Sequence, residues 1–319
     1  MSDLGRTLVA SAPTRLDFGG GWTDVPPFPE ERGGCVCNVA INRRATVHLT
    51  PSGVDVPPTD RLIGAAVRRS GVSHLDIRID CDFPIGAGLG GSSAAGVALS
   101  AALHEWQRVA VEAADLAEWS RAVEVDELGI AGGRQDHYAA AFGGALALHF
   151  TAETVVERLP LSLLARAALE HQCVLAYTGE SRISATTISA VLDAYRSRTP
   201  RVVSALDRMA QLARLMRDAL LLGSIDEVGR LVNEHWGHQR SLHTSITTPR
   251  IDAIHTAAFA AGASGMKALG ASGGGCVIVF APDDRVSEVS RAVAKLATLL
   301  PWQIDDVGAV VGPVASLQQ

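Results

Sequence analysis

The sequence predicts a fold of mixed helices and strands, of the α+β or α/β class, divided into two halves. Segments with strand-like and helix-like patterns alternate along the chain. A domain junction is expected near Pro160, so that residues 1–160 form an N-terminal domain and residues 161–319 a C-terminal domain. The 319 residues are 47% hydrophobic and 19% charged, which excludes a disordered chain and allows a sizeable core.

The first half is predicted to begin with a strand that enters a triple-glycine turn. The expected strands are 8–18, 35–41, 45–50, 74–80, 145–150 and 154–158, and we expect 35–41 and 45–50 to pair with each other. The expected helices are 60–70, 92–107 and 112–128. A glycine-punctuated loop is predicted over residues 129–144.

The second half is predicted to be richer in helix. Its expected strands are 172–177, 276–281 and a last one near 302–307. The expected helices are 250–261, 284–299 and a long helical run over 184–240, broken near Pro200 and Gly223.

Charge, hydrophobic stretches and cysteine content limit the partners and the compartment that we expect. The net charge is −6 and the basic residues are scattered, so we expect no nucleic-acid partner. No stretch reaches the roughly 18 apolar residues of a membrane span, so we expect no membrane partner. The five cysteines indicate reduced thiols in a cytoplasmic protein, and Cys35 and Cys37 are expected to be buried apolar thiols.

Residues 84–95, Pro-Ile-Gly-Ala-Gly-Leu-Gly-Gly-Ser-Ser-Ala-Ala, form the most informative segment. Its four glycines, Gly86, Gly88, Gly90 and Gly91, let the backbone turn sharply and bring its N–H groups close to an anion. The small residues behind them are typical of the start of a buried helix, whose first N–H groups and dipole also favour negative charge. The segment is therefore predicted to hold a phosphate group.

Two common phosphate-binding motifs match this loop only in part. A dinucleotide fingerprint needs a second strand that ends in an acidic residue about 20 positions later, but the candidate, Glu112, lies in a helix-patterned segment. A P-loop needs a lysine where this chain has Ser92. An NAD(P)-dependent oxidoreductase stays a distant alternative function, and a plain glycine-rich turn is the alternative without a ligand.

Three further strings place charged residues beside glycines. Near the N-terminus a strand delivers Arg15 to the triple-glycine turn, which Asp24 follows. Glu124 lies at the end of a predicted helix, and Asp136 lies in the glycine-punctuated loop. Three consecutive glycines at 273–275 precede a β-branched run, which suggests backbone pressed close to a ligand or another segment. Taken alone, each charged residue could also be a solvated surface charge.

Together the four strings resemble, in order and relative placement, the motifs of the GHMP small-molecule kinases, named for galactokinase, homoserine kinase, mevalonate kinase and phosphomevalonate kinase. The resemblance covers residues 12–280. It implies the two-domain α+β GHMP fold with the active site between the N- and C-terminal domains, and it implies ATP and Mg²⁺ as cofactors. The string GGWTD is similar to fucokinases, whereas GGRQDHYAAAFGG and KALGASGGG are similar to D-glycero-D-manno-heptose 7-phosphate kinases.

The resemblance also implies roles for individual residues. Asp136 matches the catalytic aspartate and Arg15 its arginine partner. The residues that match the nucleotide-binding loop are Gly86, Gly88, Leu89, Gly90, Gly91, Ser92 and Ser93. Glu124 and Ser92 match the magnesium ligands, with Ser93 as the alternative hydroxyl and Asp126 and Glu127 as alternative carboxylates. The candidate substrate-binding residues are Asp24, Thr23, Gly273, Gly274, Gly275 and Arg182.

Other positions keep two interpretations each. Trp22 could stack on a sugar face or wedge the turn, and Arg240 is a second candidate, with Arg182, for a substrate phosphate. His235 and His238 are expected to serve packing or substrate contact instead of zinc binding.

The predicted function is an ATP-dependent kinase that phosphorylates a hydroxyl of a sugar or sugar phosphate. The anomeric hydroxyl is the leading candidate. The best-supported acceptors are a heptose 7-phosphate and a fucose-like sugar, and a cyclitol or modified sugar is the alternative. The sequence does not predict an oligomeric state.

Overall fold

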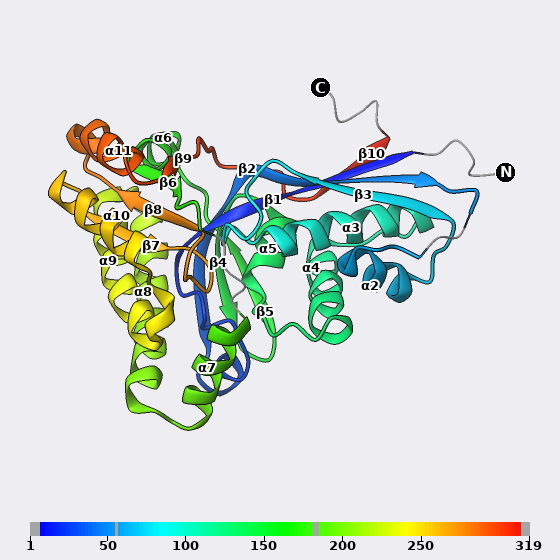
Figure 1. Cartoon of the computed structure of the whole chain (residues 1–319), viewed down its shortest axis with the longest axis horizontal. Helices are drawn as coiled ribbons and strands as arrows, with labels where there is room; N and C mark the ends of the chain where they lie inside the picture. The colour runs from blue at the N-terminus through cyan, green and yellow to red at the C-terminus, as the bar shows by residue number, and fades with distance from the viewer. Residues whose placement is uncertain (1–6, 55–56, 181–184, 314–319) are drawn as a thin grey trace.

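The computed structural model describes residues 7–54, 57–180 and 185–313 and arranges them around two sheets (Figure 1). The larger sheet has the order β10-β1-β2-β4-β5, with β3 paired to β2; its strands are β1 (Leu8–Gly19), β2 (Gly34–Pro51), β3 (Leu75–Cys81), β4 (Ala145–Phe150), β5 (Thr154–Arg158) and β10 (Val310–Pro313). The smaller sheet has the order β7-β8-β6-β9; its strands are β6 (Cys173–Tyr177), β7 (Gly265–Ala268), β8 (Cys276–Phe280) and β9 (Thr298–Leu299). All the pairs described are antiparallel. A dinucleotide-binding domain would instead need a mostly parallel sheet.

The N-terminal helices pack against the larger sheet, and the later helices surround the smaller sheet (Figure 1). The N-terminal helices are α1 (Phe28–Arg32), α2 (Arg61–Ser70), α3 (Gly91–Gln107), α4 (Ala113–Ala122) and α5 (Gln135–Phe142). The later helices are α6 (Leu163–Gln172), α7 (Ala185–Arg196), α8 (Pro200–Leu221), α9 (Ile225–Leu242), α10 (Pro249–Ala260) and α11 (Val286–Ala294). Helices α3 and α5 pack against β1 and β2, while α8 packs against another part of the same two strands and α9 packs against β7. The long strands β1 and β2 therefore reach from one half of the molecule into the other.

The two strands expected at 35–41 and 45–50 are one strand, β2, so the prediction that they pair with each other was wrong. Both parts of β2 pair with β1. Thr14 faces Ile41 whereas Pro13 faces Arg44, so two polar residues between them, Asn42 and Arg43, form a bulge in the ladder. A bulge, and not a turn, therefore separates the two predicted segments.

The loop expected over residues 129–144 contains a helix, α5, and this correction matters for the site. Glycines surround the segment Gln135–Phe142, but its own sequence, QDHYAAAF, contains no glycine or proline and includes a run of three alanines, the best helix former. Gly143 ends the helix with φ 66°, in the left-handed region. Asp136 is therefore a residue of the first helical turn and not of a loop.

The C-terminal end also differs from expectation. Helix α11 ends at Ala294, where the sequence predicted 299, and residues 302–307 make only a single bridge, between Ile304 and Ile41. The last strand is β10, which lies beside β1 in the larger sheet. The chain thus returns to the first sheet after building the second, and the division into domains at residue 160 stays a prediction.

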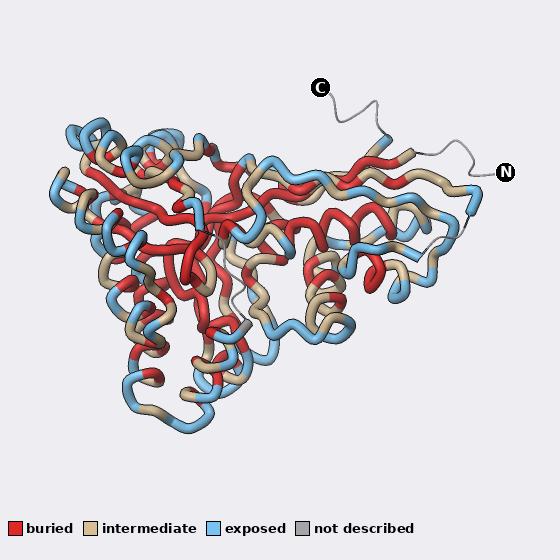
Figure 2. Tube along the Cα trace, viewed as in Figure 1, coloured by how far each residue is buried: buried red, intermediate tan, exposed pale blue. Residues whose placement is uncertain are grey.

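Buried apolar side chains form three clusters. Figure 2 shows buried residues in red along the strands and along parts of the helices. One cluster joins residues of both sheets, among them Phe18 of β1 and Phe280 of β8, whose rings meet edge to face at 5.8 Å. Cys35 and Cys37 are buried free thiols, as predicted, and burial raises the pKa of Cys35 to about 11. Among the described helices, none is long and apolar enough to cross a membrane.

Candidate active site

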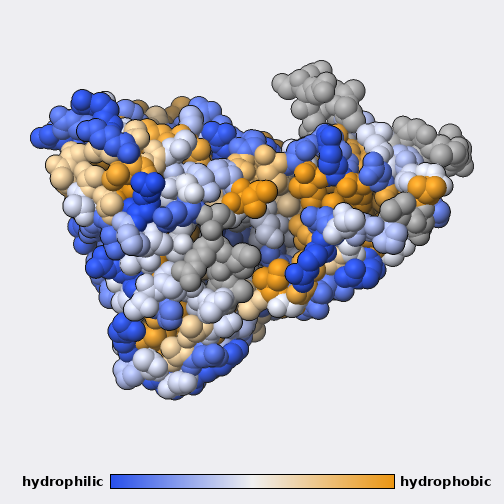
Figure 3. All heavy atoms as spheres, in the orientation of Figure 1, coloured by the Kyte–Doolittle hydropathy of each residue, from blue (hydrophilic) through white to orange (hydrophobic). Residues whose placement is uncertain are grey.

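A cavity of about 560 Å³ lies where β1, the glycine loop before α3, the first turn of α5 and the segment after β7 meet. On the face shown in Figure 3, hydrophobic side chains gather beside a hollow near the middle of the molecule. The predicted nucleotide-binding residues Gly86, Gly88, Leu89, Gly90, Gly91, Ser92 and Ser93 all line the cavity. So do Arg15, Asp24, Glu124 and Asp136, which are far apart in the sequence.

The glycine loop presents free backbone N–H groups to this cavity. Helix α3 begins at Gly91, and its N-cap residue, Gly90, provides no side chain to bond the first N–H groups. An uncapped N-terminus of a 17-residue helix favours an anion through these N–H groups and the helix dipole. Gly88 has φ 73°, and a Cβ there would lie 2.7 Å from the carbonyl oxygen of Leu269, so only glycine fits this turn.

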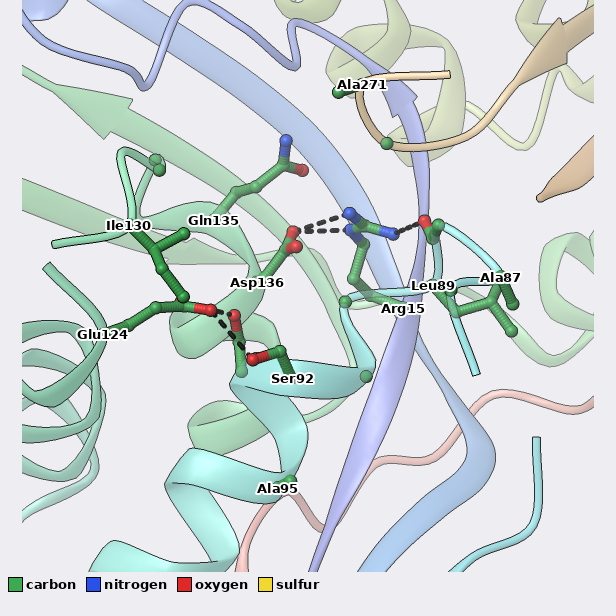
Figure 4. Close-up of a pocket in the computed structure, with 18 of the residues that line it drawn as sticks. Arg15, Ala87, Leu89, Ser92, Ala95, Glu124, Ile130, Gln135, Asp136 and Ala271 are labelled. Carbon is green, nitrogen blue, oxygen red and sulfur yellow. Dashed lines mark hydrogen bonds and ion pairs between the residues drawn. The ribbon is translucent and has the colours of Figure 1, made fainter. Parts of the chain in front are cut away.

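Arg15 and Asp136 form an ion pair that faces the cavity (Figure 4). The guanidinium donates to Asp136 Oδ1 from Nε at 2.8 Å and from Nη2 at 2.7 Å. Its remaining Nη1 donates to the carbonyl oxygen of Gly88 at 2.6 Å, which ties the pair to the glycine loop. The Arg15 side chain is 3% exposed and that of Asp136 is 26% exposed, so the carboxylate is the accessible member.

Asp24 fixes the start of α5. Its Oδ2 accepts the backbone N–H groups of Arg134 at 2.8 Å and of Gln135 at 3.0 Å. Burial raises the pKa of Asp24 to about 6; the negative charges of Asp136 and Asp17 act in the same direction, and the Gln135 hydrogen bond opposes them. The predicted sugar-binding carboxylate thus also caps the helix that carries Asp136.

Glu124 lies on a π-helical turn, Val123–Glu127, directly after α4. Its Oε1 accepts a hydrogen bond from Ser92 Oγ at 2.8 Å, and its Oε2 lies 3.4 Å from Ser93 Oγ (Figure 4). Burial by itself would raise the pKa of Glu124, but its contacts with His137, Ser92 and Ser93 outweigh burial, and the pKa is lowered. The two alternative carboxylates, Asp126 and Glu127, approach Arg69 at 3.9 and 3.5 Å instead.

This pair of oxygen donors is compatible with Mg²⁺. One carboxylate and one hydroxyl, completed by water and phosphate oxygens, is a common way for proteins to hold this cation. No cluster of three or more His, Cys, Asp or Glu side chains in the described part of the chain could hold a metal by itself.

The three glycines at 273–275 support the glycine loop from the other half of the molecule. A Cβ on Gly275 would lie 2.7 Å from the carbonyl oxygen of Ala87, and the neighbouring Cys276 N–H donates to that oxygen at 2.7 Å. Gly273 N–H donates to Ile246 O at 2.9 Å. Among described residues 269–275, those that line the cavity are Gly270 and Ala271. Contact of substrate with Gly273, Gly274 and Gly275 therefore stays a prediction.

The remaining predicted substrate residues lie in different places. Thr23 is fully buried, and its Oγ1 donates to Gly20 O at 2.7 Å and accepts Cys35 N–H at 3.1 Å, so it holds the glycine turn. Arg182 lies outside the described residues. Arg240 is exposed and does not line the cavity. Trp22 is 7% exposed, lines the cavity and has φ 82°, which is rare for an aromatic residue.

Two contacts between the halves were not predicted. Lys267 Nζ of β7 donates to Asp17 Oδ2 of β1 at 2.9 Å, and the two side chains are 0% and 3% exposed. His235 of α9 accepts the Gly20 N–H at Nε2, 2.9 Å away. Burial lowers the pKa of His235 well below its usual value, so the ring is neutral and can accept. A lysine between apolar residues of a short strand was the only sequence signal for the first contact.

Comparison with known proteins identifies the family. The model of the GHMP kinases N terminal domain matches residues 60–144, and the GHMP kinases C terminal model matches residues 216–298. The chain belongs to the GHMP kinase family. The predicted family and its two-domain α+β fold are thus confirmed.

Relatives within the family include sugar kinases. The chain is 25% identical to D-glycero-alpha-D-manno-heptose 7-phosphate kinase of Campylobacter jejuni, over 91% of this chain and 94% of that protein. It is 26% identical to a bifunctional fucokinase/GDP-fucose pyrophosphorylase of Arabidopsis thaliana, over 92% of this chain, but it spans only 32% of that protein's length.

Solved structures of this family share the fold. A D-glycero-D-manno-heptose 1-phosphate kinase from Bacteroides thetaiotaomicron superposes with a TM-score of 0.79 at 24% identity and covers 96% of this chain and 99% of that one. A galactokinase from Lactococcus lactis, solved with galactose, has a TM-score of 0.77 at 16% identity and covers 96% and 95% of the two chains.

The raised pKa of Asp24 gives a prediction about stability. The folded value is about 6 against an ordinary 3.8, so the folded protein binds this proton more tightly than the unfolded chain does. Stability is therefore lost as the pH rises from about 4 to about 6, and it stays lower above that window. Asp24→Asn keeps an oxygen for the two amide N–H groups without the charge. We compare the change in unfolding free energy that Asp24→Asn causes at two pH values. We expect this change to favour the folded state by on the order of 2–3 kcal/mol more at about pH 7.5 than at about pH 4.

Urea unfolding at the two pH values measures this difference. Asp76→Asn, which removes an exposed carboxylate of β3, is the matched control and should show a much smaller pH dependence. Equal effects of Asp24→Asn at both pH values would contradict the assignment of a perturbed carboxyl at this position.

Proposed function

We propose that this GHMP kinase uses ATP and Mg²⁺ to phosphorylate a hydroxyl of a sugar or sugar phosphate. The anomeric hydroxyl is the leading candidate. One observation carries the proposal: the Arg15–Asp136 ion pair and the uncapped N-terminus of α3 face the same cavity. The pair provides a carboxylate for the acceptor hydroxyl, and the helix start provides N–H groups for the phosphates.

The glycine loop is the proposed site of the ATP phosphates. Its N–H groups are held in place before any ligand arrives, so they can stabilise negative charge without reorganisation during the reaction. Ser92 Oγ and Glu124 would hold Mg²⁺, which when bound supplies positive charge to the phosphate oxygens.

Asp136 is proposed to orient the acceptor hydroxyl and to receive its proton. A bond forms between the hydroxyl oxygen and the γ-phosphorus while the bond from that phosphorus to the ADP oxygen breaks, and the hydroxyl proton passes to the carboxylate. Arg15, nearly buried and bound to Asp136 Oδ1, stabilises the negative charge of the waiting carboxylate.

The proposed acceptor site lies around Gly21, where three buried polar atoms have no hydrogen-bond partner among the described residues: Asp17 Oδ1, Gln135 Oε1 and Trp22 Nε1. All three side chains line the cavity. The position of a Cβ on Gly21 would be 2.4 Å from Asp17 Oδ2 and 3.0 Å from Gln135 Nε2, so this glycine leaves the space open. Two acceptors and one donor match hydroxyl groups, which both donate and accept, and each unsatisfied atom otherwise costs about 1–3 kcal/mol.

The charge of the acceptor distinguishes the two best-supported sugars. Arg15 is the only cationic side chain among the described residues that line the cavity, and its donors already bind Asp136 and Gly88. A heptose 7-phosphate would therefore need another cation for its phosphate, and Arg182 is our candidate. A fucose-like sugar, or a cyclitol or other modified sugar, would need none.

Removal of the Asp136 carboxylate tests the chemistry. We expect Asp136→Asn to lower kcat by about 10²- to 10⁴-fold, because it removes the proton acceptor. Thermal stabilisation by Mg·ADP should persist, since Asp136 is not assigned to the nucleotide. The matched control, Asp115→Asn on the exposed part of α4, should leave turnover unchanged. Turnover of Asp136→Asn within about tenfold of wild type would contradict the proposed role.

A screen of sugars and sugar phosphates tests the acceptor, with ADP release as the readout and NMR to locate the phosphorylated carbon. We expect turnover of D-glycero-D-manno-heptose 7-phosphate or of L-fucose, and thermal stabilisation by Mg·ATP but not by NAD. If the heptose 7-phosphate is the acceptor, Arg182→Ala should raise its KM by about tenfold or more, the cost of one charge-assisted hydrogen bond. If L-fucose is the acceptor, its KM should not change. Stabilisation by NAD without ADP release from any sugar would contradict the kinase.

A further inference from the structure

We propose that His137 is a positioning residue that holds the Glu124 carboxylate in place for the metal, and that it couples the metal site to Asp136 through the first turn of α5. This inference rests on the proposed function, because it concerns the magnesium ligands assigned there. His137 itself is not proposed to touch the metal, the nucleotide or the acceptor.

A continuous chain of contacts connects four segments through this histidine. Its Nδ1 lies 3.0 Å from Ser120 Oγ of α4, and its Nε2 lies 3.0 Å from Glu124 Oε2 on the π-helical turn. The other carboxylate oxygen, Oε1, accepts from Ser92 Oγ at the start of α3 at 2.8 Å. Ser93 Oγ lies 3.4 Å from both the imidazole Nε2 and Glu124 Oε2.

The chemistry of the ring determines the direction of these bonds. A carboxylate can only accept, so the Nε2 of His137 carries a proton and donates it to Glu124. In the neutral ring Nδ1 then accepts the Ser120 hydroxyl, and in the charged ring Nδ1 donates to it. In either state the histidine fixes one oxygen of Glu124 and the orientation of the carboxylate plane.

The surroundings leave the histidine little freedom. His137 is 2% exposed, and both ring nitrogens have partners. A Cβ on Gly96 of α3 would lie 2.4 Å from Ser120 Oγ, so a glycine at this position makes room for the serine that orients the ring. Glu124 is 14% exposed, and Ser92 is exposed at the cavity, so the Oε1 side of the carboxylate is the side open to a ligand.

Asp136 and His137 are consecutive residues of the same helical turn, yet they serve opposite sides of the cavity. Asp136 binds Arg15 of β1, and His137 binds Glu124. A shift of this turn would move the proton acceptor and the metal-binding carboxylate together. A partner that orients a metal ligand in this way typically contributes about 10- to 100-fold to metal affinity.

The affinity for Mn²⁺ tests the inference independently of turnover and of the acceptor. Mn²⁺ replaces Mg²⁺ as the probe, its free concentration is read by electron paramagnetic resonance, and ADP is present at saturation. We expect His137→Leu to raise the Mn²⁺ dissociation constant by about 10- to 100-fold. His137→Gln, whose amide N–H can still donate to Glu124, should stay within about threefold of wild type.

Two further variants separate positioning from a loss of structure. His149→Leu is the matched control, because His149 Nε2 also lies beside a glutamate, 3.3 Å from Glu157 Oε2, but does not line the cavity. It should leave Mn²⁺ affinity unchanged. Ser120→Ala should weaken Mn²⁺ binding less than His137→Leu does, and adding it to His137→Leu should have no further effect, because Ser120 acts through the ring.

Three results would overturn the inference. The first is wild-type Mn²⁺ affinity in a folded His137→Leu protein. The second is a loss in His137→Gln as large as in His137→Leu, which would indicate packing instead of hydrogen bonding. The third applies if His137→Leu does not fold: it is an unchanged, wild-type Mn²⁺ affinity in the Ser120→Ala protein. Glu124→Gln tells which proposal fails: if it weakens Mn²⁺ binding while the His137 variants do not, the metal site stands and only the role of His137 is wrong.

Discussion

The site depends on how the first turn of α5 is held. Asp24 accepts the backbone N–H groups at the start of this turn. Within the turn, Asp136 binds Arg15, and the next residue, His137, binds Glu124. Three separate segments of the chain therefore constrain four consecutive residues. A short turn fixed from three sides can place the Asp136 carboxylate and the Glu124 carboxylate, the proposed metal ligand, in register without relying on a long loop, whose ordering would cost conformational entropy.

The second constraint is the contact between the two halves. The buried Asp17–Lys267 pair joins the two sheets beside the cavity. The His235–Gly20 and Cys276–Ala87 hydrogen bonds join the C-terminal half to the turn after β1 and to the glycine loop. A buried ion pair is weak evidence for stability, since its desolvation can exceed the attraction between the charges. Here the pair leaves Asp17 Oδ1 unbonded at the cavity, which agrees better with a role in positioning a ligand-binding carboxylate than with a role in stability alone.

Local patterns predicted the parts of the site that depend on local geometry. The glycine loop, Arg15 and Asp136 could be proposed from the sequence because each lies in a recognisable string, and the structure brings them together around one cavity. Helix α5 was missed because glycines at 129, 132, 133, 143 and 144 surround an eight-residue segment whose strongest helix signal is a run of three alanines. The Asp17–Lys267 and Gly20–His235 contacts span 250 and 215 residues, so only the packing of the two halves of the chain creates them. The bulge in β2 is likewise visible only in the register of its pairing with β1.

The most direct measurement is a crystal structure of the protein with Mg²⁺ and a non-hydrolysable ATP analogue. We predict that the metal is held by Ser92 Oγ and an oxygen of Glu124. We also predict that the β- and γ-phosphates lie on the N–H groups of residues 88–93 and that the γ-phosphate faces Asp136. A metal bound to Asp126 or Glu127, or phosphates bound away from the start of α3, would contradict the assignment of this cavity as the kinase active site.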